Sequence, residues 1–263
     1  MTSKPAPHSE IRLPPAYRLI AMDSVGSTND EAKKLAEEGA EEGTLVWARE
    51  QTKGRGRHGR TWASPRGNLY MSLILRPDCA LAEAAQLGFV TALAVGEAIG
   101  AVAPPMLEVT YKWPNDVLVH GRKVAGLLLE SKSTPTADRG GAVEWLVVGI
   151  GANVQSHPAD ARFPATNLIF EGVSPEVDES MLLEAICRHF LALANRWTED
   201  GFAPIRRLWL GHAHGLGEAV EVRLGQETLR GTFREMDESG SLILELPDSR
   251  RRTVAAGDVL FVT

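Results

Sequence analysis

The sequence predicts an α+β protein that ends in a small all-β domain. Segments with helical spacing are interspersed with short apolar runs through most of the chain, whereas strand-like runs between Gly and Asp turns follow residue 217. The chain has 263 residues, 44% of them hydrophobic, which suffices for a core in one large or two modest domains. We predict a flexible leader over residues 1–16, a large domain over 17–213 and an SH3-like β-barrel over 214–263.

The first helix and strand follow the proline-rich leader. Thr28 and Glu31 fit a capping box at the start of an Ala-, Glu- and Lys-rich run that extends to Glu42. This pattern predicts a helix, which one of the two glycines in or just after the run would end. Residues 44–49 then predict a strand.

A long polar loop separates that strand from the next one. Residues 50–68 are rich in glycine and charge, and residues 69–75 form an apolar run typical of a buried strand. Residues 82–102 have helical spacing and good helix formers throughout. Because Pro104 and Pro105 cannot continue a helix, they mark its end.

The remaining strands of the large domain follow those prolines. Three strand-like runs cover residues 107–112, 116–119 and 123–130, and the short polar link between the last two suits a hairpin. Residues 144–150 predict a further buried strand.

Two helices and a set of short strands complete the chain. Residues 180–198 predict an amphipathic helix, and residues 204–210 predict a shorter one. The barrel strands are predicted over residues 219–224, 227–236, 242–246 and 251–254. A barrel of about five such strands has the size of an SH3-like module.

Composition argues against several classes of protein. The net charge of −6 counts against a surface devoted to nucleic acid. Apolar runs such as residues 89–95 are far shorter than the roughly 20 residues that cross a bilayer, and residues 1–15 lack a signal-peptide core. We therefore expect a cytoplasmic protein without a membrane partner. Cys79 and Cys187 are far apart and lack CxxC spacing, so they support neither a disulfide framework nor a zinc site.

The most informative segment is KGRGRHGRTW, residues 53–62, within the predicted polar loop. It combines four Lys and Arg residues with three glycines and has no acidic residue. Glycines let the backbone approach a ligand, and Arg side chains bind phosphate or carboxylate oxygens in pairs. The segment therefore suits an anionic small molecule enclosed by a mobile loop. It lacks the GxxxxGK[ST] spacing of a P-loop, and on composition alone it also fits a solvated or RNA-contacting basic loop.

Three further segments place polar or small residues at strand ends. KWPND, residues 112–116, can contact phosphate and hold Mg²⁺ or its waters, although Pro-Asn-Asp is also ordinary turn chemistry. RKVAGLLLE, residues 122–130, starts with a lysine and contains a glycine that permits close approach. GIGANV, residues 149–154, ends a strand with two glycines and an amide.

These four segments, in this order, resemble the catalytic domain of biotin protein ligases. The resemblance covers about residues 23–154 and, more weakly, the barrel. It implies a mixed central β-sheet flanked by helices, as in class II aminoacyl-tRNA synthetases and biotin ligases. It also implies a two-step reaction. Biotin and Mg·ATP give biotinyl-5′-AMP, and a lysine of the biotin carboxyl carrier protein of acetyl-CoA carboxylase, or of a related carboxylase, then accepts the biotinyl group.

The resemblance also assigns site residues and partners. It places biotin at Ser27, Thr28, Asn29, Gln51, Arg55, Gly56, Arg57, Lys123 and Gly126. It places ATP at Arg57, Arg60, Trp62, Lys112, Asn115 and Asn153, with Asp116 in the framework of the metal. Arg55, Arg57, Lys112 and Lys123 are the expected catalytic residues, because two anions must meet and positive charge lowers that barrier. We expect a monomer or homodimer that does not bind operator DNA.

Two other interpretations stay open. Lipoate ligases and octanoyl transferases share the related fold and also modify a carrier lysine. The transferases use a Cys nucleophile, and Cys79 and Cys187 lie outside the motifs. A non-catalytic module that binds RNA through the basic loop is the second alternative, and the acidic net charge counts against it.

Overall fold

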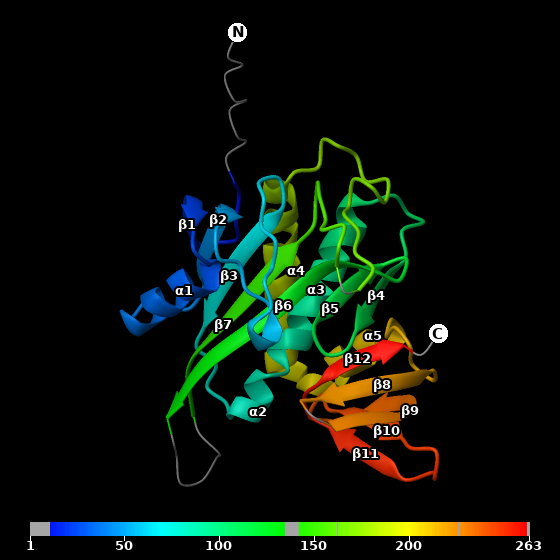
Figure 1. The fold of residues 1–263 in the computed structure, drawn as a ribbon. Coiled ribbons are helices and arrows are strands. Elements are labelled where there is room, and N and C mark those ends of the chain that lie inside the picture. The colour runs from blue at the N-terminus through cyan, green and yellow to red at the C-terminus, as the bar shows by residue number, and fades with distance from the viewer. Residues whose placement is uncertain (1–10, 135–141, 162, 226, 262–263) are drawn as a thin grey trace.

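The computed structural model describes residues 11–134, 142–161, 163–225 and 227–261. Its strands form two sheets, one of seven strands and one of five (Figure 1). Residues 1–10 of the predicted leader lie outside the described residues. Of the remainder, Ile11 and Leu13 pack against the core, and the backbone N–H of Arg12 donates to Glu184 at 2.8 Å.

The large sheet is mixed. Its strands are β1 (Arg18–Val25), β2 (Thr44–Gln51), β3 (Leu69–Leu75), β4 (Val109–Lys112), β5 (Asp116–Val119), β6 (Arg122–Thr134) and β7 (Ala142–Ala152), in the order β1-β2-β3-β7-β6-β5-β4. β1 pairs with β2 in parallel, and the other pairs are antiparallel. The predicted α+β class with a mixed sheet is confirmed. Sequence analysis missed β1, which is an edge strand without fully buried residues and therefore lacks a clear apolar period.

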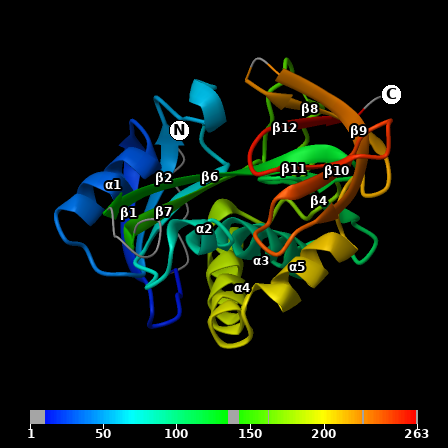
Figure 2. The same ribbon diagram turned by 90° about the horizontal axis from the view of Figure 1, so that it is seen from below.

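Helices cover both faces of this sheet. They are α1 (Thr28–Glu37), α2 (Leu81–Ala84), α3 (Leu87–Val102), α4 (Glu179–Asp200) and α5 (Phe202–Gly211), with a 3₁₀ turn η1 (Arg57–Gly59). Figure 2 shows α3, α4 and α5 gathered on one side of the sheet, whereas α1 lies against β2, β3 and β7. Alternation along β2 explains both layers. Leu45 and Trp47 join the main core, and Val46 on the other face packs in the cluster that contains Ala32 of α1.

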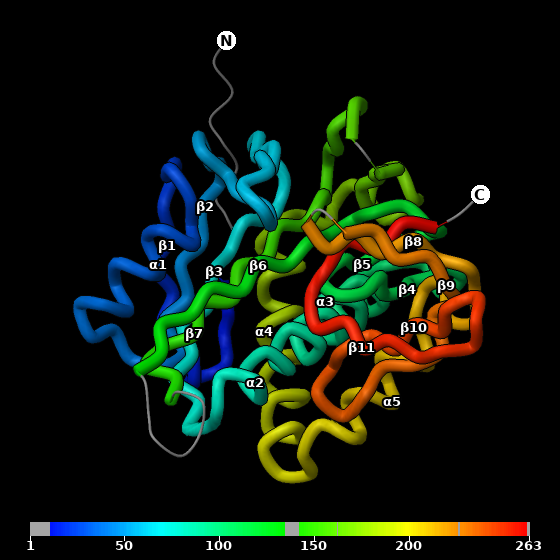
Figure 3. Tube along the Cα trace, turned by 60° about the horizontal axis from the view of Figure 1, so that its bottom comes forward, coloured from blue at the N-terminus to red at the C-terminus, as the bar shows by residue number. Residues whose placement is uncertain are grey.

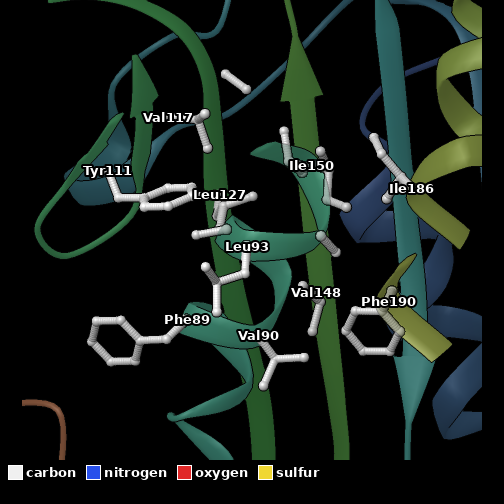
Figure 4. Packing of buried hydrophobic residues seen from close by; sticks show 14 of the residues in the cluster. Phe89, Val90, Leu93, Tyr111, Val117, Leu127, Val148, Ile150, Ile186 and Phe190 are labelled. Carbon is white, nitrogen blue, oxygen red and sulfur yellow. The ribbon is translucent and has the colours of Figure 1, made fainter. Parts of the chain in front are cut away.

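The main core lies between the sheet and α3 and α4. Figure 4 shows its centre, which consists of Phe89, Val90, Leu93, Tyr111, Val117, Leu127, Val148, Ile150, Ile186 and Phe190. Strand residues two apart supply one wall, and helix residues three or four apart supply the other. This layer gives the opposite face of the sheet a rigid support.

Two sequence predictions for helices are wrong in detail. The helix predicted over residues 82–102 is interrupted at Ala85 and Gln86. The side chain of Gln86 accepts a hydrogen bond from the indole N–H of Trp197 at 2.9 Å, which ties this break to α4. The capping box at Thr28 is also absent, because Ser27 is the N-cap and the Thr28 hydroxyl instead donates to Gln51 at 3.1 Å.

By length and composition alone, residues 81–102 would suffice to cross a membrane. In the fold, 72% of that apolar window is buried, and α3 packs against α4 and β6. The segment therefore has the position of a core helix.

The second sheet forms the C-terminal barrel. Its strands are β8 (Ala219–Leu224), β9 (Glu227–Met236), β10 (Leu242–Glu245), β11 (Arg251–Val254) and β12 (Asp258–Phe261), all antiparallel, in the order β11-β10-β9-β8-β12. Figure 3 shows it at the opposite end of the large sheet from α1. The barrel packs on the large domain: the Trp113 indole N–H donates to the carbonyl of Gly240 at 2.9 Å.

Candidate active site

Glycines on neighbouring strands of the large sheet form the floor of the site, on the same face of the sheet as α1. Gly149 and Gly151 follow Val147 at intervals of two along β7, so all three lie on the same face of the sheet. Val147 packs with α1. Gly151 pairs with Gly126 of β6, and Gly149 pairs with Leu128. Because Gly126, Gly149 and Gly151 have no side chain, a ligand can approach the backbone of the sheet closely at these three positions.

Side chains at the start of α1 enclose one end of the floor. A Cβ on Gly149 would lie 2.1 Å from Oδ1 of Asn29, so the glycine makes room for that amide. The Ser72 hydroxyl donates to the same Oδ1 at 2.6 Å. Gln51 accepts from the backbone N–H of Thr28 at 2.8 Å. Ser27, Thr28 and Asn29 are buried, and they form a fixed set of hydrogen-bonding groups.

The arginine loop, residues 53–62, folds over the opposite side of the floor. It is a tight hairpin in which Gly56 N–H donates to the Arg60 carbonyl at 2.7 Å and Trp62 N–H donates to Gly54 at 2.9 Å. His58 at its tip adopts a positive φ of 55°. The Trp62 ring reaches the floor, since a Cβ on Gly151 would lie 2.5 Å from its Nε1. That N–H is buried without a hydrogen-bond partner among the described residues.

Two lysines and a carboxylate form the polar wall at β4, β5 and β6. Lys123 Nζ lies 2.5 Å from Asp116 Oδ1, and Lys112 Nζ lies 3.6 Å from Asp116 Oδ2. Lys112 is buried and lies 3.3 Å above the centre of the Phe163 ring. Burial lowers the pKa of Lys112 to about 8, although Asp116 opposes that shift.

Arg57 and Arg55 are held by different partners. Arg57 Nη1 donates to Asn115 Oδ1 and to the carbonyl of Gly257, both at 3.2 Å. Burial lowers the pKa of the Arg55 guanidinium, but the carboxylates of Glu130 and Asp30 outweigh burial and raise it. Arg55 thus lines the site with its charge already paired.

The barrel supplies part of the wall, which the sequence did not indicate. Asp258, the first residue of β12, forms an ion pair with Arg60 and lies 3.7 Å from Arg57. Burial raises the pKa of Asp258, but the hydrogen bond from Arg60 and the positive charges of Arg60 and Arg57 together lower that pKa below its usual value.

All the predicted site residues converge on one pocket of about 480 Å³. The predicted residues in its lining are Ser27, Thr28, Asn29, Gln51, Arg55, Gly56, Arg57, Arg60, Trp62, Lys112, Asn115, Asp116, Lys123, Gly126 and Asn153. Sequence reasoning missed Phe163, which lies over Lys112, and Asp258, which comes from the barrel. No signal in the sequence indicates either residue.

The donor set at Asp116 suits a magnesium ion that arrives with phosphates. The described residues contain no group of three or more His, Cys, Asp or Glu that could hold a metal ion by itself. Asp116 offers one carboxylate, which is already paired with two lysines. Protein sites for Mg²⁺ typically combine one or two carboxylates with substrate phosphates and waters, so this arrangement fits an ion shared with a nucleotide.

Two family models match this chain. Residues 13–211 match the biotin/lipoate A/B protein ligase family, and residues 215–262 match the biotin protein ligase C-terminal domain. The chain belongs to the biotin/lipoate A/B protein ligase family.

Individual biotin ligases resemble this family member over most of its length. The biotin–[acetyl-CoA-carboxylase] ligase of Paracoccus denitrificans is 40% identical, over 89% of this chain and 97% of its own. The bifunctional ligase/repressor BirA of Bacillus subtilis is 36% identical, over 90% of this chain and 72% of its own. The structure of the Aquifex aeolicus biotin protein ligase, in complex with biotin and ATP, matches with a TM-score of 0.74 and 29% identity. That match covers 92% of this chain and 97% of the Aquifex chain.

Proposed function

We propose that this protein is an ATP-dependent biotin protein ligase. It forms biotinyl-5′-AMP from biotin and Mg·ATP and transfers the biotinyl group to a lysine of a biotin carboxyl carrier protein. The observation that carries the proposal is that one pocket joins a neutral hydrogen-bonding end to a cationic end beneath the arginine loop. The similarity to biotin–[acetyl-CoA-carboxylase] ligases supports the same acceptor class.

The two ends of the pocket divide the substrates. The groups of Ser27, Thr28, Asn29 and Gln51 present both donors and acceptors, as the ureido ring of biotin requires. The biotin carboxylate then points toward Lys123, and the nucleotide lies under Trp62 with its phosphates at Lys112 and Arg57. Because Trp62 Nε1 is buried and unpartnered among the described residues, it is available to a ring-nitrogen acceptor.

In the first step, the biotin carboxylate attacks the α-phosphorus and pyrophosphate leaves. Lys123 and Lys112 offset the repulsion between the two anions and stabilise the charge that develops on the phosphoryl oxygens. Magnesium bound to the phosphates would supply further positive charge, with Asp116 as the protein ligand. The arginine loop keeps water from the mixed anhydride, which would otherwise hydrolyse.

In the second step, the ε-amine of the acceptor lysine attacks the biotinyl carbonyl carbon and AMP leaves. The anhydride already activates the acyl group, so no covalent enzyme nucleophile is needed. Cys187 is buried in the core and Cys79 lies outside the pocket, which disfavours a transferase that uses a Cys nucleophile.

The direct test is mass spectrometry of a purified carrier domain after incubation with this protein, biotin and Mg·ATP. We expect a single biotinyl adduct that depends on ATP. The same incubation with lipoate tests the neighbouring activity of the family. Modification by lipoate and not by biotin would contradict the proposal.

We also propose that the large domain ends at residue 213 and that the barrel begins at residue 214. This boundary lies in the gap between the two matched family regions. The net charge of −6 favours a protein partner over DNA. We further propose a monomer or homodimer that acts in the cytoplasm.

Lys112 gives a testable pH dependence. Because its pKa lies at about 8, its ammonium is present below that pH and is lost above it. We expect kcat/KM for ATP, measured by pyrophosphate exchange, to fall as the pH rises through about 8. The Lys112→Arg variant should lack this decline, because Arg stays protonated. An identical decline in that variant would show that another group is responsible.

Gly151 gives a steric prediction. In Gly151→Ala the new Cβ would lie 2.5 Å from Trp62 Nε1 and 2.6 Å from Cε2, and β7 is fixed between β3 and β6. Since Trp62 must move away, we expect KM for ATP to rise about 5- to 150-fold, which corresponds to the roughly 1–3 kcal/mol cost of overpacking. Gly100→Ala on α3 is the matched control, because its Cβ meets nothing within 4 Å. Equal KM values in the two variants would contradict this placement of Trp62.

A further inference from the structure

We infer that Glu130 is a positioning residue that links the biotin-binding end of the pocket to closure of the arginine loop. The inference rests on the proposed function and goes beyond it, because Glu130 is not one of the residues that line the pocket. It lies on β6, paired with Val147, at the edge of the pocket floor.

Glu130 contacts both halves of the site through one carboxylate. Its Oε2 accepts from Asn29 Nδ2 at 2.9 Å and from Arg55 Nη2 at 2.9 Å. Asn29 belongs to the neutral end of the pocket, and Arg55 belongs to the arginine loop. A single oxygen atom therefore fixes the orientation of a ligand-facing amide and the position of the loop.

The other contacts of Glu130 hold that carboxylate in place. Its Oε1 accepts from Lys33 Nζ at 2.8 Å, and Lys33 also contacts Asp30 at 3.0 Å. Asp30 in turn lies 2.6 Å from Arg55 Nη2. The Glu130 side chain is only 23% exposed, so these charge-assisted bonds are partly shielded from water.

The orientation of Asn29 depends on this carboxylate. Its Oδ1 accepts from Ser72 and its Nδ2 donates to Glu130 and to the Leu128 carbonyl. A carboxylate can only accept, so it holds Nδ2 toward β6 and Oδ1 toward Ser72. The chain of contacts from Ser72 through Asn29 and Glu130 to Arg55 lets a ligand that seats against Asn29 stabilise the closed loop.

The test is Glu130→Gln, which keeps the shape and removes the charge. We expect the KM for biotin and the rate of adenylate release each to rise about tenfold, the size expected when one charge-assisted hydrogen bond is lost. The kcat of pyrophosphate exchange at saturating substrates should stay within about twofold, because no reacting atom is touched. Glu144→Gln on β7 is the matched control, since it removes a carboxylate paired with Lys132 at the far end of the same hairpin.

A double-mutant cycle with Arg55→Met separates linkage from two independent effects. Arg55→Met should by itself speed adenylate release, and adding Glu130→Gln should speed it little further. Additive effects on release would overturn the inference. An unchanged rate of adenylate release in Arg55→Met would also overturn the inference. This second outcome does not depend on whether Glu130→Gln folds. Thermal melting shows whether that variant is folded.

The outcomes also distinguish this inference from the proposed function. Wild-type protein that fails to biotinylate a carrier domain would overturn the proposed function. Active wild-type protein, with Glu130→Gln indistinguishable from Glu144→Gln, would overturn only the role of Glu130.

Discussion

Replacement of Lys123 by alanine should reduce adenylation by about 10²- to 10³-fold, the cost of removing a preorganised charge from a transition state. Lys123 Nζ lies 2.5 Å from Asp116 and 5.2 Å from the centre of the Trp62 ring, so it is the member of the polar wall that contacts the loop. Without it, the biotin carboxylate and the α-phosphate meet without their shared cation. Pyrophosphate exchange measures adenylation, and single-turnover transfer from preformed biotinyl-AMP measures the second step.

The control for this variant lies on the same strand. Lys132→Ala removes an exposed lysine of β6 that pairs with Glu144 at 2.9 Å, and it should leave both steps intact. Unfolding of Lys123→Ala is not expected, because that side chain borders a pocket and does not enter the core. Exchange at the wild-type rate in folded Lys123→Ala would remove this lysine from the proposed chemistry.

Replacement of Arg57 by glycine should leave the fold intact and make the enzyme lose its adenylate. Arg57 ties the arginine loop to Asn115 of the large domain and to the Gly257 carbonyl of the barrel, both at 3.2 Å. Loss of such charge-assisted bonds costs about 1.5–3 kcal/mol, which corresponds to roughly 10- to 100-fold faster release. Stopped-flow fluorescence of bound biotinyl-AMP gives the rate, and biotin on bystander lysines reports the escaped product.

Two companion variants sharpen this result. Arg57→Ala separates loss of the guanidinium from the added backbone freedom of glycine. Arg250→Gly removes an exposed arginine that pairs with Asp248 in a barrel turn, and it should release adenylate at the wild-type rate. If adenylate dissociates from Arg57→Gly as slowly as from wild type, the loop is not what retains it.

Apolar patterning predicted most of the helices and strands, whereas the mixed sheet that joins them was implied by the family resemblance. β3 is buried at every position and was predicted at its observed bounds. β1 was missed because its residues are half-buried or exposed. The prediction for β6 ended too early. The strand extends to Thr134, but its last four residues are exposed and carry no apolar signal. The break between α2 and α3 depends on contacts of Gln86 with Trp197, which are far apart in sequence.

The residues that meet in the pocket were predicted, but their pairing with one another was not. The resemblance of four motifs to biotin protein ligases named those residues, yet it gave no sign that Arg55 would be paired with Glu130 and Asp30. A signal for Glu130 was present: it follows Gly126 and Leu128 at intervals of two, so it shares their face of β6. No such local pattern links Asp258 to Arg60, since the two are 198 residues apart.

The position of Asp258 also bears on synthesis of the protein. The contacts that pin the arginine loop from the barrel side come from Gly257 and Asp258, which leave the ribosome long after the loop itself. While translation is under way, the loop lacks both of these contacts. A chain still attached to the ribosome would therefore lack the barrel contacts of the loop, and full retention of the reactive intermediate would begin only after the completed chain is released and the barrel has folded.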